Sequence, residues 1–137
     1  MGKLNFSISE LIKSETANLH NINNMPDINS LDNMLDLIYY VLQPIRDRLK
    51  KPMVITSGFR CKRVNELLNG AKTSQHLKGQ AADFIVPGMA VDEVIQFIRN
   101  SYIEYDQLIA EKNGSSEWVH ISFSKDNNRN QFLRITK

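Results

Sequence analysis

Hydrophobic residues follow a helical spacing in the first part of the chain and an alternating spacing in the last part. In segment 30–51 they recur every three or four residues, which places them on one face of a helix. This face consists of Leu31, Met34, Leu35, Ile38, Leu42, Ile45 and Leu49. Ser30 is the expected N-cap, and Pro44 removes an N–H donor and predicts a kink. The segment therefore predicts a long helix that packs on the core.

Shorter stretches with the same patterns predict the other elements. Ser7 and Glu10 have the spacing of a capping box, so a short helix is expected to begin there. Further helices are predicted over 61–70 and 90–101, and segment 71–80 is predicted to be a loop. Strands are predicted over 52–58, 81–86, 105–112, 117–123 and 130–136, with a hairpin turn at 113–116.

The order of these elements indicates the fold class. Helices come mostly early, and strands that pair through a hairpin dominate the end. This order predicts an α+β domain in which helices pack against a small antiparallel or mixed sheet. A length of 137 residues suits one such domain over residues 1–137.

Composition narrows the possible functions. The net charge of +2 and the lack of a dense basic run argue against a nucleic-acid partner. No stretch approaches the ~20 apolar residues of a membrane span. Cys61 is the only cysteine, so an internal disulfide is impossible. The first residues contain no apolar run typical of a signal peptide, so we expect the protein to be made in the cytoplasm. Nothing in the sequence demands more than a monomer, which is the expected state.

Three residues suggest a metal site. His76, Asp83 and His120 offer the imidazole and carboxylate ligands that zinc prefers, and three protein ligands leave one position open in a catalytic zinc site. His76 lies in the predicted loop, and Asp83 and His120 lie in predicted strands. Trp118 and Ser122 share a face with His120 if that strand is regular.

Glu117 is a candidate general base, because a carboxylate beside a metal site can accept a proton from water. Its offset of three residues from His120 is odd, so the two side chains point to opposite faces of a regular strand. Glu117 can reach the site only if the strand begins with a bend or a bulge.

The segments "SQHLKGQAADF" and "EWVHIS" resemble the zinc D-Ala-D-Ala carboxypeptidase family. That family includes the vancomycin-resistance D,D-dipeptidases and shares its fold with the hedgehog signalling domain. Its pattern, Ser-x-His-x-x-Gly-x-Ala-x-Asp followed by Glu-x-x-His, is filled by Ser74, His76, Gly79, Ala81, Asp83, Glu117 and His120. Upstream segments resemble the branch found in phage and prophage genes, so that the resemblance covers residues 6–123.

The resemblance implies a hedgehog-like zinc peptidase fold with one Zn²⁺ bound by His76, Asp83 and His120. It also implies that Glu117 is the general base and that Arg60 stabilises the charge that develops on the scissile carbonyl. Ser74 would contact the substrate or support a ligand. Apart from the resemblance, Trp118 is expected either to line the substrate cleft or to serve in packing.

The expected function is hydrolysis of peptide bonds in bacterial peptidoglycan, of the D-Ala-D-Ala carboxypeptidase or the endopeptidase type. The protein would reach the cell wall after release or as part of a phage particle. The alternative is a non-catalytic, zinc-stabilised module that binds the cell wall or a protein, such as a phage tail component. The intact pair of Glu117 and Arg60 argues against this alternative, because a pure binder needs no base.

Overall fold

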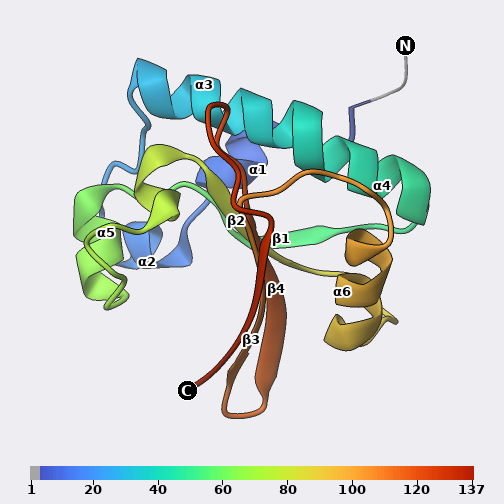
Figure 1. Cartoon of the computed structure of the whole chain (residues 1–137). Coiled ribbons are helices and arrows are strands. Elements are labelled where there is room, and N and C mark those ends of the chain that lie inside the picture. Colours follow the sequence, from blue (N-terminus) through green and yellow to red (C-terminus); the bar gives the residue numbers. More distant parts are fainter. Residues whose placement is uncertain (1–3) are drawn as a thin grey trace.

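The computed structural model describes residues 4–137 and has helices packed around a mixed sheet (Figure 1). The helices are α1 (Ile8–Ile12), α2 (Glu15–Leu19), α3 (Ile28–Leu37), α4 (Gln43–Leu49), α5 (Lys62–Leu67) and α6 (Val91–Arg99). A π-helical turn, η1 (Ile38–Leu42), joins α3 to α4, and a 3-10 turn, η2 (Gln75–Lys78), precedes the second strand. The strands are β1 (Val54–Ser57), β2 (Ala81–Ile85), β3 (Gln107–Asn113), β4 (Ser116–Ser122) and β5 (Gln131–Thr136).

The sheet has the strand order β1-β2-β4-β3-β5. Neighbouring strands are antiparallel except for β3 and β5, which are parallel. The predicted hairpin is present, with Asn113 opposite Ser116 across its turn. The α+β prediction is therefore confirmed, and the parallel edge strand makes the sheet mixed.

The long helix predicted over 30–51 is present as α3, η1 and α4, which run on as one stretch in Figure 1. Its N-cap is Asp27 rather than Ser30, because the Asp27 carboxylate accepts the backbone N–H of Ser30 at 2.7 Å. The irregularity expected at Pro44 lies just before it, in the π-helical turn. The buried face differs from the prediction at Leu35, which is 50% exposed, while Leu37 and Val41 are fully buried.

The short helix predicted to begin at Ser7 is present as α1. Ser7 caps α1 by accepting the N–H of Glu10 at 3.1 Å, which confirms that prediction. The predicted loop 71–80 contains η2, a single 3-10 turn that ends at Gly79. Within residues 4–137, no helix has the length and apolar character that a membrane span requires.

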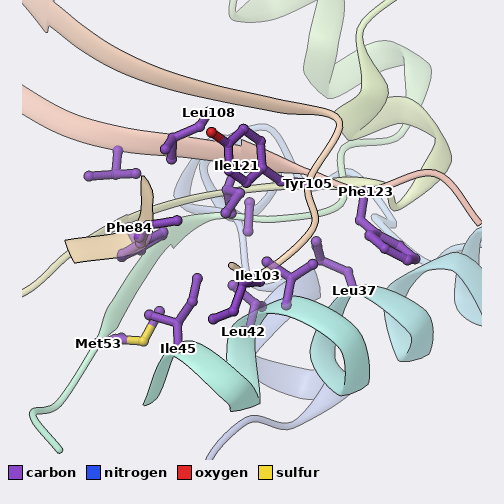
Figure 2. Packing of buried hydrophobic residues seen from close by; sticks show 14 of the residues in the cluster. Leu37, Leu42, Ile45, Met53, Phe84, Ile103, Tyr105, Leu108, Ile121 and Phe123 are labelled. Atoms are coloured by element: carbon purple, nitrogen blue, oxygen red, sulfur yellow. The ribbon is translucent and has the colours of Figure 1, made fainter. Parts of the chain in front are cut away.

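The two faces of the sheet have different roles. One face packs against α6 and the long helix to form the core, and Figure 2 shows Phe84, Leu108 and Ile121 meeting Leu37, Leu42 and Ile45 there. Strand residues alternate between the faces, so the neighbours of these core residues point to the opposite side. That opposite face carries Asp83, Ile109 and His120 and lies next to η2 and α5.

Candidate metal centre and active site

Three side chains from separate segments converge on the face of the sheet opposite the core. His76 belongs to η2, Asp83 to β2 and His120 to β4, and one potential ligand atom from each lies within 4.8 Å of the others. All three are buried. The structure thus brings together the three ligands that the sequence predicts.

Strand register places two of the three. Asp83 lies directly opposite His120 in the antiparallel β2–β4 pair, and Ser57 of β1 lies opposite Asp83 on the other side. Directly opposite residues share a face of the sheet, so their side chains meet. The central position of β2 between β1 and β4 therefore fixes Asp83 beside His120.

Turn η2 places the third ligand. Ser74 caps η2, and its hydroxyl accepts the backbone N–H of His76 at 3.2 Å. The carbonyl oxygen of His76 accepts the N–H of Arg60 at 3.0 Å. Gly79 ends the turn with φ +71°, and a Cβ there would overlap the carbonyl oxygen of Ser30 in α3. Gly79 thus lets η2 pack close to the long helix.

The donor set fits a zinc ion. His76 Nδ1 lies 2.7 Å from the carbonyl oxygen of Gly58, which fixes Nδ1 as the donor and leaves Nε2 free as a ligand. Asp83 Oδ1 lies 3.4 Å from His76 Nε2 and 2.9 Å from His120 Nδ1. Nitrogen and oxygen ligands about 2.0–2.1 Å from a tetrahedral zinc stand about 3.3 Å apart, which is close to these spacings.

The charges around Asp83 favour its ionised form. Burial alone would raise its pKa, but the hydrogen bonds and charges of His76 and His120 outweigh burial and hold the pKa well below its usual range. Asp83 is therefore an anionic ligand at neutral pH.

Arg60 lies at the edge of the metal centre. Its Nη2 is 3.5 Å from Asp83 Oδ2, its Nε donates to the Ser57 hydroxyl at 3.1 Å, and its Nη1 lies 3.4 Å from Asn65 Oδ1. Its side chain is 16% exposed and lines the same cavity as the three ligands. Arg60 thus lies beside the three candidate ligands, the neighbourhood that the family resemblance implies for it.

Glu117 is not brought to this site. The β3–β4 register is regular from Leu108 to Asn113, without the bulge that Glu117 would need. Glu117 lies opposite Lys112, with its Oε1 3.8 Å from Lys112 Nζ, and its side chain is 52% exposed. It lines a different cavity, beside Pro87 and Gly88. The prediction from the odd offset, that Glu117 and His120 lie on opposite faces of a regular strand, is therefore confirmed, and Glu117 points away from the metal centre.

Glu111 occupies the place expected for that carboxylate. It belongs to β3, lies opposite Trp118, and brings its Oε1 to 3.7 Å from His120 Nδ1. Its side chain is 16% exposed and lines the cavity with the three ligands. Burial, followed by the negative charge of Asp83, raises the pKa of Glu111. The alternation of β3 and the hairpin turn are the sequence signals that could have found it.

The metal centre borders a cleft made of two cavities that share part of their lining. The larger cavity has a volume of about 700 Å³ and the smaller about 320 Å³. Both are lined by Arg60, Leu68, Asp83 and Trp118. Ser74 lines the larger one, and the buried indole N–H of Trp118 finds no acceptor within residues 4–137. Ser74 and Trp118 thus both reach the cleft.

Comparison with known proteins agrees with this geometry. No curated protein matches the chain. A model of the family described as Peptidase M15 matches residues 4–122, which includes the three candidate ligands, Arg60 and Glu111. The match covers most of the chain, and the fold and the buried His–Asp–His cluster are consistent with it. The chain therefore belongs to the Peptidase M15 family of metallopeptidases.

Proposed function

We propose that this protein is a zinc-dependent peptidase that hydrolyses peptide bonds of bacterial cell-wall peptidoglycan, with Glu111 as its general base. The observation that carries the proposal is the combination of His76, Asp83 and His120 with a largely buried carboxylate in one cavity. A binding module needs the three ligands, but it does not need the carboxylate beside them.

Each ligand residue contributes through its own atoms. His76 Nε2, His120 Nδ1 and Asp83 Oδ1 would hold the ion, and the Gly58 carbonyl keeps the ring of His76 in the required tautomer. When bound, zinc supplies a Lewis acid that polarises a carbonyl and lowers the pKa of water from 15.7 to about 7.

Glu111 and Arg60 carry the remaining steps. The Glu111 carboxylate accepts a proton from the attacking water and later returns it to the leaving amine, because it lies in the cavity beside His120 and is the nearest carboxylate to the three ligands described above. Arg60, fixed by Ser57 and Asn65, donates to the oxygen that becomes negative as the carbonyl is attacked. Such a donor contributes about 3–4 kcal/mol in well-studied hydrolases.

The shape of the cleft favours a substrate that extends to both sides of the cut bond. The two cavities share Arg60, Asp83 and Trp118 in their linings, so a peptide that occupies both would extend to either side of the metal centre. This arrangement favours an endopeptidase, whose substrate continues past the scissile bond, over an enzyme that removes only a terminal residue.

The test is digestion of purified peptidoglycan followed by mass spectrometry of the fragments. We expect the zinc-loaded protein to release fragments with new amino and carboxyl ends, and we expect a chelator to abolish their release. The mass of the fragments identifies the bond. Binding to peptidoglycan without any new ends, under conditions in which a known peptidase cuts it, would reject the proposal in favour of a binding module.

A further inference from the structure

Arg129 lines the larger cavity but belongs to a segment that follows the part of the chain matched by the family. It lies just before β5. Two backbone hydrogen bonds tie this segment to the residues just before β3: Asn130 N–H to the Tyr105 carbonyl and Gln131 N–H to the Asp106 carbonyl, both at 3.0 Å. The position of Arg129 is therefore set by the sheet.

Asp106 fixes the guanidinium of Arg129. Nε and Nη2 of Arg129 donate to the two carboxylate oxygens of Asp106 at 2.8 Å each, and the backbone N–H of Arg129 adds a third bond at 2.9 Å. Gln75, the neighbour of His76, donates to the same carboxylate at 2.9 Å. The Asp106 side chain is only 4% exposed, so the carboxylate that holds Arg129 is buried although the Arg129 side chain is not.

The Arg129 side chain lines the larger cavity and keeps N–H donors that Asp106 does not use. The Arg129 side chain is 53% exposed, and its remaining N–H donors meet no acceptor in the part of the chain that the structure describes. A rigidly held guanidinium loses little conformational freedom when it binds a ligand. Its planar N–H groups match the geometry of a carboxylate.

We propose that Arg129 recognises a carboxylate of the substrate and so determines which peptides this enzyme accepts. The inference rests on the proposed peptidase function and adds its substrate class: peptides that carry a free carboxylate at some distance from the cut bond. Arg129 lines the larger cavity and not the smaller one, so the carboxylate lies in the larger cavity. It is either the terminal carboxylate of the peptide or that of a side chain.

The experiment measures binding, so that it does not depend on cleavage. A zinc-loaded Glu111→Gln variant is titrated by calorimetry with a soluble stem-peptide fragment and with forms in which each carboxylate in turn is a carboxamide. We expect one carboxamide form to bind about 10- to 100-fold more weakly, the range for a lost hydrogen bond to a charged group. The form that is weakened identifies the source of the carboxylate.

Variants then assign the effect to Arg129. Adding Arg129→Gln should weaken binding of the unmodified peptide by a similar factor and leave the weakened carboxamide form unchanged. Arg129→Lys, which keeps the charge but not the planar fork, should fall between them. The matched control is Arg134→Gln, because Arg134 pairs with the exposed Asp92 of α6 and lies outside the cleft. This control should change neither the affinity for the unmodified peptide nor the affinity for the carboxamide form.

Three outcomes overturn the inference: equal affinity for all forms of the peptide, no binding of any form, or equal weakening of acid and amide forms by Arg129→Gln. The comparison of peptides needs no arginine variant, so it remains decisive even if the Arg129→Gln protein folds poorly. Selective binding without cleavage by the wild-type protein would reject the proposed function alone. Cleavage without any carboxylate dependence would reject this inference alone.

Discussion

At the scale of single residues, the two strands of one hairpin carry glutamates with opposite surroundings. Glu111 is largely buried in the cavity next to His120, whereas Glu117 is half exposed and pairs with Lys112. Replacing Glu111 by Gln keeps the shape of the side chain and removes the proton acceptor. We expect the rate of peptide cleavage to fall about 10²- to 10⁴-fold. The measurement is release of new amino groups from peptidoglycan.

Glu117→Gln is the matched control and should retain the wild-type rate. Zinc content, measured on the purified proteins, should be the same in both variants and in the wild type. If instead Glu117→Gln abolishes cleavage and Glu111→Gln does not, the assignment of the base to β3 fails and the motif spacing prevails over the strand register.

Residue types and motifs predicted most of the site, because ligands are recognised by their chemistry. His76, Asp83 and His120 do converge, and Arg60 lies beside them. The motif Glu-x-x-His points to Glu117, although its odd offset from His120 predicts that the two side chains lie on opposite faces of a regular strand. The strand is regular, and the register of the hairpin brings Glu111 instead of Glu117 to the cavity beside His120. The partnership of Arg129 with Asp106 depends on a strand pairing that no local pattern predicts.

At the scale of elements, turn η2 depends on a close approach to α3. An alanine at position 79 would need an unfavourable positive φ, and its Cβ would come within 2.7 Å of Met34 Cγ as well as overlap the Ser30 carbonyl. We expect Gly79→Ala to lower the free energy of unfolding by about 2–4 kcal/mol. It should also weaken zinc binding, because η2 carries His76. Denaturant unfolding and a zinc titration measure the two effects.

Gly114→Ala separates crowding from backbone strain. Gly114 also has a positive φ, +62°, but a Cβ there would meet nothing within 4 Å. That variant should lose only about 1–2 kcal/mol and keep its zinc affinity. Equal losses in the two variants would show that packing against α3 contributes nothing.

The carboxylate of Asp106 joins η2, β3 and the segment before β5. Hydrogen bonds from Arg129, acting against burial, lower the pKa of Asp106 to about 2. A lowered folded-state pKa stabilises the fold above the usual value of 3.8, and this contribution is lost as pH falls toward 2. Asp106→Asn should therefore lower the free energy of unfolding by about 1–2 kcal/mol at pH 7. This range allows for solvent screening of the half-exposed Arg129.

Unfolding in denaturant between pH 7 and pH 2 tests this prediction. The difference in stability between wild type and Asp106→Asn should shrink as the pH falls below 4 and should be smallest near 2. A difference that stays constant over this range would mean that the carboxylate charge does not contribute.

Elements with a strong local pattern were predicted, and those set by distant contacts were not. The long helix and the β3–β4 hairpin follow from periodicity and turn residues. The sequence predicts Ser30 as the N-cap of the long helix, but the N-cap is Asp27. Both residue types are good caps, and only the fold decides between them. β5 pairs in parallel with β3 and not with β4, the strand that precedes it in the sequence. Periodicity cannot indicate which strand an edge strand joins.

At the scale of the whole molecule, zinc should stabilise the fold because an ion held by the three candidate ligands would link η2, β2 and β4. At a free zinc concentration about 100 times the Kd, the gain is about 2.7 kcal/mol, or a rise in Tm of about 9 °C for a chain of this length. Thermal unfolding with zinc and with a chelator measures the shift. His120→Ala should abolish it.

His20→Ala is the matched control for that experiment. His20 lies exposed at the C-terminal end of α2 and takes no part in the cluster. Its removal should leave the zinc-dependent rise in Tm intact. Loss of the rise in this variant would place the stabilising ion elsewhere.

The three ligands come from positions 76, 83 and 120, and the last of them lies on a strand inserted between β2 and β3. A nascent chain therefore lacks a complete metal centre until His120 has left the ribosome and β4 has paired. On the proposed function, proteolytic capacity would arise only after the sheet has been assembled, and a translation product that ends before β4 would lack the third ligand, His120.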